Sequence, residues 1–328
     1  MALTIERCDS VAHGEEIKAL FLRNDYPTFP AFFDRAYPYA VSTGGDSWIA
    51  RNGQGSIVGH LAAFPRVFRQ GARVARAALL VDNLFDRAYR NYWSAVELCR
   101  RALADLRQAG ECEFAYTDPT LPAQALLKAV GFTTVGALRR FVLPLHPLYA
   151  GLFRIMARAQ PLFLERLDNG PWETRVAEAL RALLPGTRFR GERSLELYAT
   201  RLGGDNIREW HWLLLRAQPD DGAAVVALVL VARQPGEAVL RVVDLLWDEA
   251  RVSPASVVHA VARSARADGF RKLSMVTLDE SALARSLERC GFIRRSDALP
   301  LVVYPTRRGA VLPPGRDWLL TYFDGSAW

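Results

Sequence analysis

Residues 79–136 of the chain read LLVDNLFDRAYRNYWSAVELCRRALADLRQAGECEFAYTDPTLPAQALLKAVGFTTVG. Residues 241–296 repeat this plan as RVVDLLWDEARVSPASVVHAVARSARADGFRKLSMVTLDESALARSLERCGFIRRS. Both segments begin with an apolar strand that runs into Asp, a variable residue, Leu, an aromatic residue and Asp, and both reach a Gly-Phe pair near their ends. Self-similarity over such a length indicates two copies of one structural unit.

Each copy predicts the same order of elements. After the turn, apolar residues at helical spacing predict a helix that stops at Gly110 or Gly269, because glycine suits the left-handed position after a helix. A strand, a second helix, the Gly-Phe pair and a last strand follow. The last strands are expected at residues 138–143 and 299–304, and a hairpin before each copy at 47–64 and 223–244. This order predicts an α/β fold with a mixed sheet.

The two copies divide the chain into three expected parts. We predict an N-terminal domain at residues 1–145, a helical connector at 146–194 and a C-terminal domain at 195–328. Within the connector, residues 148–167 are amphipathic, with arginines on the polar side. We interpret this segment as an inter-domain helix that buries its apolar face, with binding to a membrane surface or a carrier protein as the alternative.

Composition limits the class of protein. The 328 residues are 50% hydrophobic and 23% charged, as in globular chains, and the net charge is +7. Only three of the 42 basic residues are lysines, and the arginines are spread over both copies, which indicates a compositional bias. No apolar run is long enough to span a membrane, and the N-terminus lacks an apolar signal region, so we expect a cytoplasmic protein. The four cysteines have no metal-binding spacing, so no metal is expected.

The turn that opens the first helix of each copy carries an arginine and, at a fixed spacing, a small residue. These are Arg90 and Ala95 around Trp93 in the first copy, and Arg251 and Ser256 around Pro254 in the second. The turn resembles the [R/Q]-x-x-G-x-[G/A] turn of the GNAT superfamily of N-acyltransferases, in which a later strand and helix also end in Gly-Phe. The chain is therefore similar to a tandem GNAT protein, with two GNAT-like domains joined by a connector.

This resemblance implies acetyl-CoA or acyl-CoA as co-substrate. In the family, backbone N–H groups at the helix N-terminus bind the coenzyme pyrophosphate. In the first copy the resemblance assigns coenzyme binding to the strand end and the turn, namely Leu84, Phe85, Arg90, Asn91, Tyr92, Trp93, Ser94 and Ala95. Since Trp93 and Pro254 stand where the family has glycine, an acyl carrier protein is the alternative donor.

In the family an amine attacks a thioester where the fourth and fifth strands part, which requires a base for the ammonium proton. Asp82 in the first copy and Asp244 in the second lie in apolar strands at this place, so they are candidate bases. The alternative is that each carboxylate pairs locally with an arginine. His60, on the third strand, is a second candidate base because the pKa of histidine lies near neutrality.

The family also supplies an acid for the leaving thiolate, a tyrosine four residues before Gly-Phe. Leu127 and Leu287 occupy these positions, so the usual acid is missing from both copies. Tyr116 on the fifth strand is a candidate substitute, with a core position as the alternative. The aromatic-rich residues 25–39 lie where the first helices of the family roof the acceptor site.

The leading hypothesis is an acyltransferase of the EC 2.3.1 type that moves an acyl group from acyl-CoA or an acyl carrier protein to a small-molecule amine. The first copy is the better candidate for catalysis because it keeps Val58-Gly59, Arg90 and Tyr116. One alternative is a catalytically degenerate tandem GNAT module that binds or scaffolds. Another is an aminoacyl-tRNA-dependent transferase of the Fem type, but no run of basic and aromatic residues indicates nucleic acid.

Overall fold

The computed structural model describes residues 3–146, 159–167, 172–183, 186–203, 208–220 and 222–325. The chain divides into two compact units, and neither is a continuous segment. Unit 1 comprises Met1–Phe68, Val74–Val135 and Pro300–Leu312, and unit 2 comprises Arg69–Arg73, Gly136–Leu299 and Pro313–Trp328.

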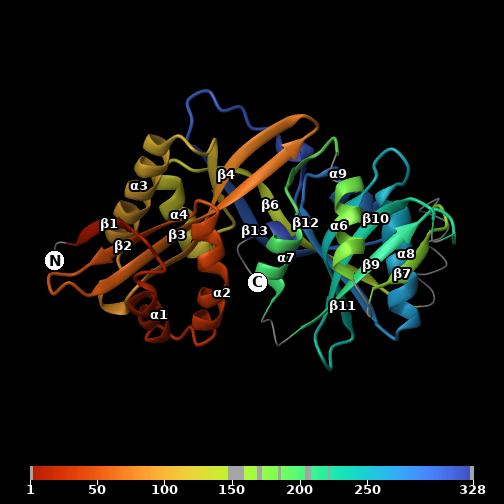
Figure 1. The fold of residues 1–328 in the computed structure, drawn as a ribbon, viewed down its shortest axis with the longest axis horizontal. Coiled ribbons are helices and arrows are strands. Elements are labelled where there is room, and N and C mark those ends of the chain that lie inside the picture. Colours follow the sequence, from red (N-terminus) through yellow and green to blue (C-terminus); the bar gives the residue numbers. More distant parts are fainter. Residues whose placement is uncertain are drawn as a thin grey trace. The chain divides into compact units, whose positions relative to one another are not determined.

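Unit 1 is a mixed sheet with helices on both faces (Figure 1). Its elements are β1 (Thr4–Cys8), α1 (Gly14–Leu22), α2 (Phe29–Ser42), β2 (Asp46–Arg51), β3 (Ile57–Gln70), β4 (Arg73–Phe85), α3 (Tyr92–Ala109), β5 (Phe114–Thr117), α4 (Leu121–Ala129) and the end of β13 (Ile293–Pro305). The strands lie in the order β1-β2-β3-β4-β5-β13. Helices α1 and α2 cover one face of the sheet, and α3 and α4 cover the other.

Local signals explain where these elements begin and end. The β2–β3 hairpin turns where the Asn52 side chain accepts hydrogen bonds from the backbone of Gln54 and Ser56, and its strands pair antiparallel, which confirms the predicted hairpin. Helix α3 begins at an N-cap, where the Asn91 side chain accepts from the Ser94 N–H. It ends at Gly110, whose φ of +67° is easy only for glycine.

Unit 2 repeats this plan. Its elements are β6 (Thr133–Pro144), β7 (Phe163–Arg166), α6 (Trp172–Leu183), β8 (Phe189–Gly191), α7 (Leu195–Leu202), β9 (Glu209–Arg216), β10 (Val225–Arg233), β11 (Val239–Trp247), α8 (Pro254–Ala267), β12 (Lys272–Leu278), α9 (Ala282–Arg289), β14 (Trp318–Leu319) and the 3₁₀ turn η3 (Tyr322–Asp324). The strands lie in the order β6-β12-β11-β10-β9-β7. Helix α8 begins with Ser253 as N-cap and Pro254 in its first turn.

The last strand of each copy belongs to the sheet of the other unit, which differs from the sequence prediction. Strand β6 follows the first copy but pairs antiparallel with β12 of unit 2, where Phe141 and Leu143 enter the core. Strand β13 follows the second copy, and its end pairs antiparallel with β5 of unit 1, where Val302 enters the core. The prediction that residues 138–143 and 299–304 close their own copies is therefore wrong, because an apolar strand pattern does not specify its partner strand.

The expected helical connector is helical only in part. Helix α6 lies within it, but residues 163–166 form β7, which pairs antiparallel with the edge of β9, and residues 189–191 form β8. The amphipathic helix predicted over residues 148–167 is thus wrong for its last part, and residues 147–158 lie outside the described residues. Backbone pairing with an available sheet edge outweighs helical periodicity in so short a segment.

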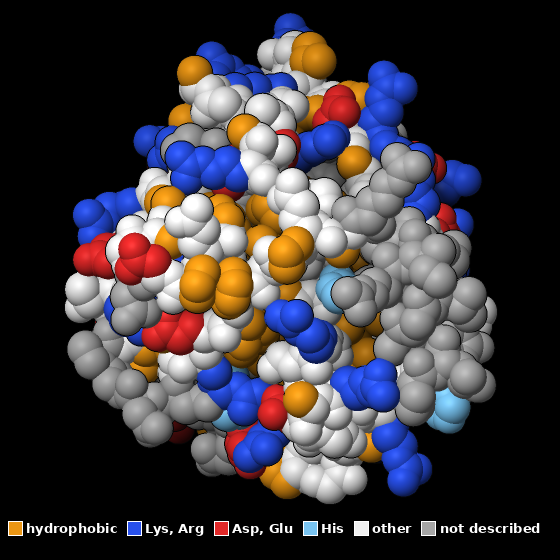
Figure 2. Space-filling model, turned by 90° about the vertical axis from the view of Figure 1, so that its right-hand side faces the viewer, with side chains coloured by type: hydrophobic (Ala, Val, Ile, Leu, Met, Phe, Trp, Pro, Cys, Tyr) orange, Lys and Arg blue, Asp and Glu red, His pale blue; other side chains and the backbone are white. Residues whose placement is uncertain are grey.

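No helix within the described ranges is long and apolar enough to cross a membrane. The same ranges contain no group of three or more His, Cys, Asp or Glu side chains that could hold a metal ion. On the face shown in Figure 2, basic side chains are scattered among acidic and apolar ones.

Candidate functional site

In unit 1, strands β4 and β5 part where the sequence places its candidate base. Their parallel pairing ends with Leu79 opposite Tyr116, while β4 continues to Phe85. Asp82 lies three residues beyond the last pair, and its φ of +57° is in the left-handed region, which is uncommon for a residue other than glycine. Such backbone strain is concentrated at functional sites, because the surrounding structure must hold it in place.

Two side chains from other elements hold Asp82. The Tyr37 hydroxyl, on α2, donates a hydrogen bond of 2.7 Å to Asp82 Oδ2. His60 Nδ1, on β3, lies 3.2 Å from the backbone oxygen of Asp82. Tyr37 and His60 are fully buried among aromatic rings, including Phe21 and Phe64. The structure thus brings together two predicted site residues, Asp82 and His60, and adds Tyr37.

Burial sets the charge states of this cluster. It raises the pKa of Asp82 to about 6, although the hydrogen bond from Tyr37 opposes that shift. It lowers the pKa of His60 to about 4, so His60 is neutral at neutral pH. A carbonyl oxygen can only accept, so His60 Nδ1 carries the proton and Nε2 carries the lone pair. Nε2 is buried, and it has no hydrogen-bond partner among the described residues. Asp82 is therefore suited to be a base, and His60 positions the Asp82 backbone.

The predicted coenzyme residues lie at the end of β4 and the start of α3. Leu84 and Phe85 are buried, and a Cβ on Gly59 would lie 2.4 Å from the Phe85 ring, so glycine is required there. Arg90 donates to the backbone oxygen of Phe85 and to Asn24, both neutral groups, so its charge is available to an anion.

The first turn of α3 differs from an open anion site. The Asn91 side chain already accepts the N–H of Ser94, one of the groups that an anion would use. Trp93, at the glycine position, is 71% exposed, and its ring contacts that of the half-exposed Tyr92. Arg90 and the helix dipole thus favour an anion, whereas the close backbone approach that glycine allows is missing.

Tyr116, the candidate acid, lies in the core. It is 1% exposed, and its ring packs against Phe68 and Phe114. Leu127 is buried in the same unit, and Leu287 is buried in unit 2. The contacts described for Tyr116 are thus with these two rings, whereas those described for Asp82 are with Tyr37 and His60.

Asp244 lies at the corresponding place in unit 2, but its surroundings differ. The pairing of β11 with β12 ends at Val242 and Met275, and the register of β10 with β11 shifts next to Asp244. Arg193 contacts both Asp244 oxygens, through Nε at 2.6 Å and Nη2 at 3.1 Å, and Tyr198 donates to Oδ2 at 2.5 Å. Although burial opposes it, the guanidinium of Arg193 lowers the pKa of Asp244 below its usual value.

The C-terminal segment occupies the gap between β11 and β12. Thr321 forms a backbone bridge with Thr277, donates 2.8 Å to Asp244 Oδ1, and is followed by Asp324, which binds Arg193. Trp318 of this segment is buried. Asp244 is thus a structural carboxylate, and the parting of the strands in unit 2 is filled by the chain itself.

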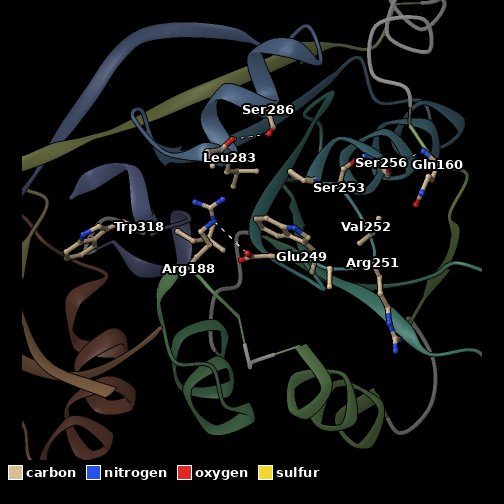
Figure 3. Close-up of a pocket in the computed structure, with 15 residues that line it drawn as sticks. Gln160, Arg188, Glu249, Arg251, Val252, Ser253, Ser256, Leu283, Ser286 and Trp318 are labelled. Atoms are coloured by element: carbon tan, nitrogen blue, oxygen red, sulfur yellow. Dashed lines mark hydrogen bonds and ion pairs between the residues drawn. The ribbon is translucent and has the colours of Figure 1, made fainter. Parts of the chain in front are cut away.

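A cavity of about 510 Å³ remains in unit 2, between the start of α8 and the start of α9 (Figure 3). Its lining includes Arg188, Trp247, Glu249, Val252, Leu283 and Trp318. In the close-up, Arg188 and Glu249 face each other, and Arg251 extends away from them. Its lining also includes Arg251, Pro254 and Ser256 of the turn that opens α8.

Sequence reasoning missed Tyr37, Arg193 and Tyr198. Tyr37 had a signal, since it lies in the aromatic-rich residues 25–39 that were expected to roof the acceptor site. Arg193 had only an indirect one, because a buried Asp244 needs a cationic partner, and nothing in the sequence selects one of 39 arginines.

Known proteins match the chain in structure and not in sequence. No protein-family model matches the sequence, and no curated protein is significantly similar to it. A GCN5-related N-acetyltransferase from Anabaena variabilis matches with a TM-score of 0.68 at 13% identity, covering 94% of this chain and 74% of the other. A conserved protein of unknown function from Enterococcus faecalis gives 0.69 at 10% identity, with coverages of 94% and 74%.

A tandem GNAT protein from the clavulanic acid biosynthesis pathway matches with a TM-score of 0.54 at 13% identity, covering 94% of this chain and 100% of the other. At sequence identities of 10–13%, these structural matches show the fold alone. The chain therefore has a tandem GNAT fold, which confirms the predicted α/β class with two GNAT-like units.

Proposed function

We propose that this chain is an N-acyltransferase that moves an acyl group from a thioester donor to a small-molecule amine, and that unit 1 is catalytic. The observation that carries the proposal is Asp82, a carboxylate with a pKa raised to about 6 on a strained strand at the parting of β4 and β5. A base works best when its pKa lies near the working pH. Asp244, by contrast, is neutralised by Arg193.

In the proposed reaction Asp82 takes a proton from the ammonium form of the acceptor, and the amine attacks the thioester carbonyl. Tyr37 holds the carboxylate through Oδ2, and His60 holds its backbone. Amide N–H groups of β4 beyond Leu79, where pairing with β5 has ended, are the proposed donors to the oxyanion. When the tetrahedral intermediate collapses, the C–S bond breaks and the second proton of the amine nitrogen passes through water to the thiolate, since Leu127 stands where the family has its acid.

The donor is acyl-CoA or an acyl carrier protein. Arg90 and the α3 dipole favour the coenzyme phosphates, while Trp93 at the glycine position favours a carrier arm, which lacks the pyrophosphate. A Fem-type transferase would need a basic surface for tRNA. The basic side chains in Figure 2 are scattered, and several pair with carboxylates, as Arg233 does with Glu209.

The test measures binding of CoA, acyl carrier protein and tRNA side by side, and then acyl transfer to a panel of amines by mass spectrometry. Asp82→Asn should lower the rate by about 10²–10⁴-fold, the usual contribution of a general base. Asp34→Asn, an exposed carboxylate on α2 that pairs with Lys18, is the matched control and should leave the rate unchanged.

Three outcomes contradict the proposal. Tight, salt-sensitive tRNA binding with aminoacyl transfer would favour the Fem-type function. Donor binding without turnover in any pair would favour a degenerate binding module. If no donor binds, and Asp82→Asn combined with Tyr116→Phe alters nothing, the enzyme hypothesis is abandoned.

A further inference from the structure

Two helices of unit 1 start at the edge of the sheet where a thioester would enter. Strands β4 and β5 are parallel, and each is followed by a helix that runs back along the sheet, α3 after β4 and α4 after β5. The two helices pack against each other (Figure 1). Their N-terminal ends therefore lie together at the edge where β4 continues past β5 and where Asp82 lies.

Each helix exposes a large apolar side chain at this edge. Trp93, in the first turn of α3, is 71% exposed, and Leu121, the first residue of α4, is 77% exposed. Tyr92 contacts the Trp93 ring and is itself half-exposed. Single exposed apolar residues are common on proteins, but several at one place indicate a surface that binds another molecule.

A cation follows on the same face of each helix. Arg100 comes seven positions after Trp93, and Lys128 seven positions after Leu121, which is about two helical turns in each case. Both cations are exposed, and in the part of the chain that the structure describes neither forms an ion pair. These four residues are called the α3–α4 surface below.

The α3–α4 surface has no counterpart in the second copy. When the copies are aligned on the arginine of the turn and on the Gly-Phe pair, its positions hold Pro254, Val261, Ser281 and Glu288. Val261 and Ser281 are buried, and Glu288 reverses the charge. The surface therefore belongs to the unit that carries the proposed base, and the shared fold does not require it.

The start of α3 also limits which donor fits there. Asn91 already accepts the Ser94 N–H, and Trp93 stands where glycine would let the backbone approach a pyrophosphate. The phosphopantetheine arm of a carrier protein has a single phosphodiester and no pyrophosphate, so it needs neither group. Arg90, whose described hydrogen bonds go to neutral groups, can serve that one phosphate.

The charge of this face favours an acidic partner. Across residues 92–101 and 121–129 the only carboxylate is Glu97, and the face is net positive. Oppositely charged surfaces attract each other at a distance and select the partner. A second copy of this chain, with its net charge of +7, would be repelled.

From these observations we propose that the α3–α4 surface docks an acidic acyl carrier protein. Trp93 and Leu121 contact apolar side chains of the carrier, and Arg100 and Lys128 lie opposite its carboxylates. This inference rests on the proposed function and selects the donor for the same site. The carrier delivers its thioester to the edge where β4 passes β5.

The test measures binding by isothermal titration calorimetry, with octanoyl acyl carrier protein and octanoyl-CoA as probes. The Asp82→Asn chain is used so that no turnover occurs. We expect saturable carrier binding that weakens as salt is added, and at least tenfold weaker binding of octanoyl-CoA. Leu121→Glu should weaken carrier binding at least tenfold. Arg100→Glu combined with Lys128→Glu should do the same and should also flatten the salt dependence.

Matched controls come from the opposite edge of the same unit. Residues 307–311 follow Pro305, which pairs with Phe114 at the start of β5. Val311→Glu changes an apolar residue that is 75% exposed, and Arg307→Glu with Arg308→Glu makes the same change in charge as the double variant of the α3–α4 surface. Both controls should leave the carrier affinity unchanged.

Four results would overturn the inference: no carrier binding, octanoyl-CoA binding as tight as carrier binding, an unchanged carrier affinity in Leu121→Glu, or an equal loss in Val311→Glu. Binding to phosphatidylglycerol vesicles that Leu121→Glu abolishes, without carrier binding, would assign the surface to a membrane instead.

The unaltered chain separates this inference from the proposed function. Acyl transfer from octanoyl-CoA without carrier binding would support the proposed function and overturn the docking surface. Carrier binding through the α3–α4 surface without transfer to any amine would support the docking surface and contradict the proposed catalysis.

Discussion

Asp82 and Asp244 occupy the same place in the two copies, and their pKa values are shifted in opposite directions. Each lies where two parallel strands part, and each accepts a hydrogen bond from a buried tyrosine, Tyr37 or Tyr198. Burial raises the pKa of Asp82, whereas Arg193 lowers that of Asp244. One guanidinium thus separates a candidate base from a structural carboxylate.

The comparison shows how a repeated sequence acquires two roles. The motif Asp, variable residue, Leu, aromatic residue, Asp is common to both copies, and so is the local backbone plan. Arg193 and the C-terminal Thr321 come from outside the repeat and donate hydrogen bonds to Asp244. Asp324, also outside the repeat, binds Arg193. Elements outside the repeat therefore decide which copy keeps a reactive carboxylate.

Arg193→Met should have the largest effect. It leaves Asp244 and Asp324 buried without their cation, which should lower the free energy of unfolding by about 3–5 kcal/mol in urea titrations. Adding Asp244→Asn and Asp324→Asn should restore a large part of that loss. If Arg193→Met is as stable as the unaltered chain, the network does not hold Asp244 as we infer.

His60→Gln tests how the stability of the chain changes at acidic pH. Folding lowers the pKa of His60 from 6.5 to about 4. The neutral ring therefore makes its full contribution to the free energy of unfolding above pH 6.5. This contribution, about 3 kcal/mol, is lost as the pH falls toward 4. Relative to the unaltered chain, His60→Gln should therefore gain stability on acidification across this window. Parallel pH profiles for the two proteins would contradict a neutral, buried His60.

Asp82→Asn should show the opposite sign. The pKa of Asp82 rises from 3.8 to about 6 on folding, so the folded state holds its proton more tightly, and stability falls as the pH rises from 4 to 6. Asparagine avoids this cost, so the variant should be more stable than the unaltered chain by about 3 kcal/mol at pH 8 and equal to it below pH 4. If Asp82→Asn is less stable than the unaltered chain at pH 8, a nearby cation stabilises the ionised Asp82 carboxylate.

The smallest effects should come from the two tyrosines. Tyr37→Phe removes a hydrogen bond that lowers the pKa of Asp82, so the acid limb of the pH–rate profile should move to higher pH. Tyr198→Phe removes the matching bond to Asp244 and should leave that limb in place, while each variant loses about 1 kcal/mol of stability. A shift of the limb in Tyr198→Phe would point to catalysis in unit 2.

Sequence reasoning reached Asp82 and His60 because an acidic residue in an apolar strand and a strand histidine are visible without a structure. It could not assign their roles, since the pKa of His60 depends on the aromatic side chains of α1 and α2 around it. Tyr116 shows the same limit, because a strand tyrosine reads alike whether it faces a gap or the core. Its contacts with Phe68 and Phe114 are tertiary.

The sequence by itself determined the repeat, the hairpin turns, the helix end at Gly110, and the position of both aspartates. These features depend on neighbours along the chain, through periodicity, capping and left-handed glycine. Only the tertiary structure decided that β6 and β13 pair with the opposite copies, that Arg193 neutralises Asp244, and that a cavity lies beside Glu249. Strand pairing, ion pairing and cavity shape all join residues distant in sequence, and no local pattern selects among the possible partners.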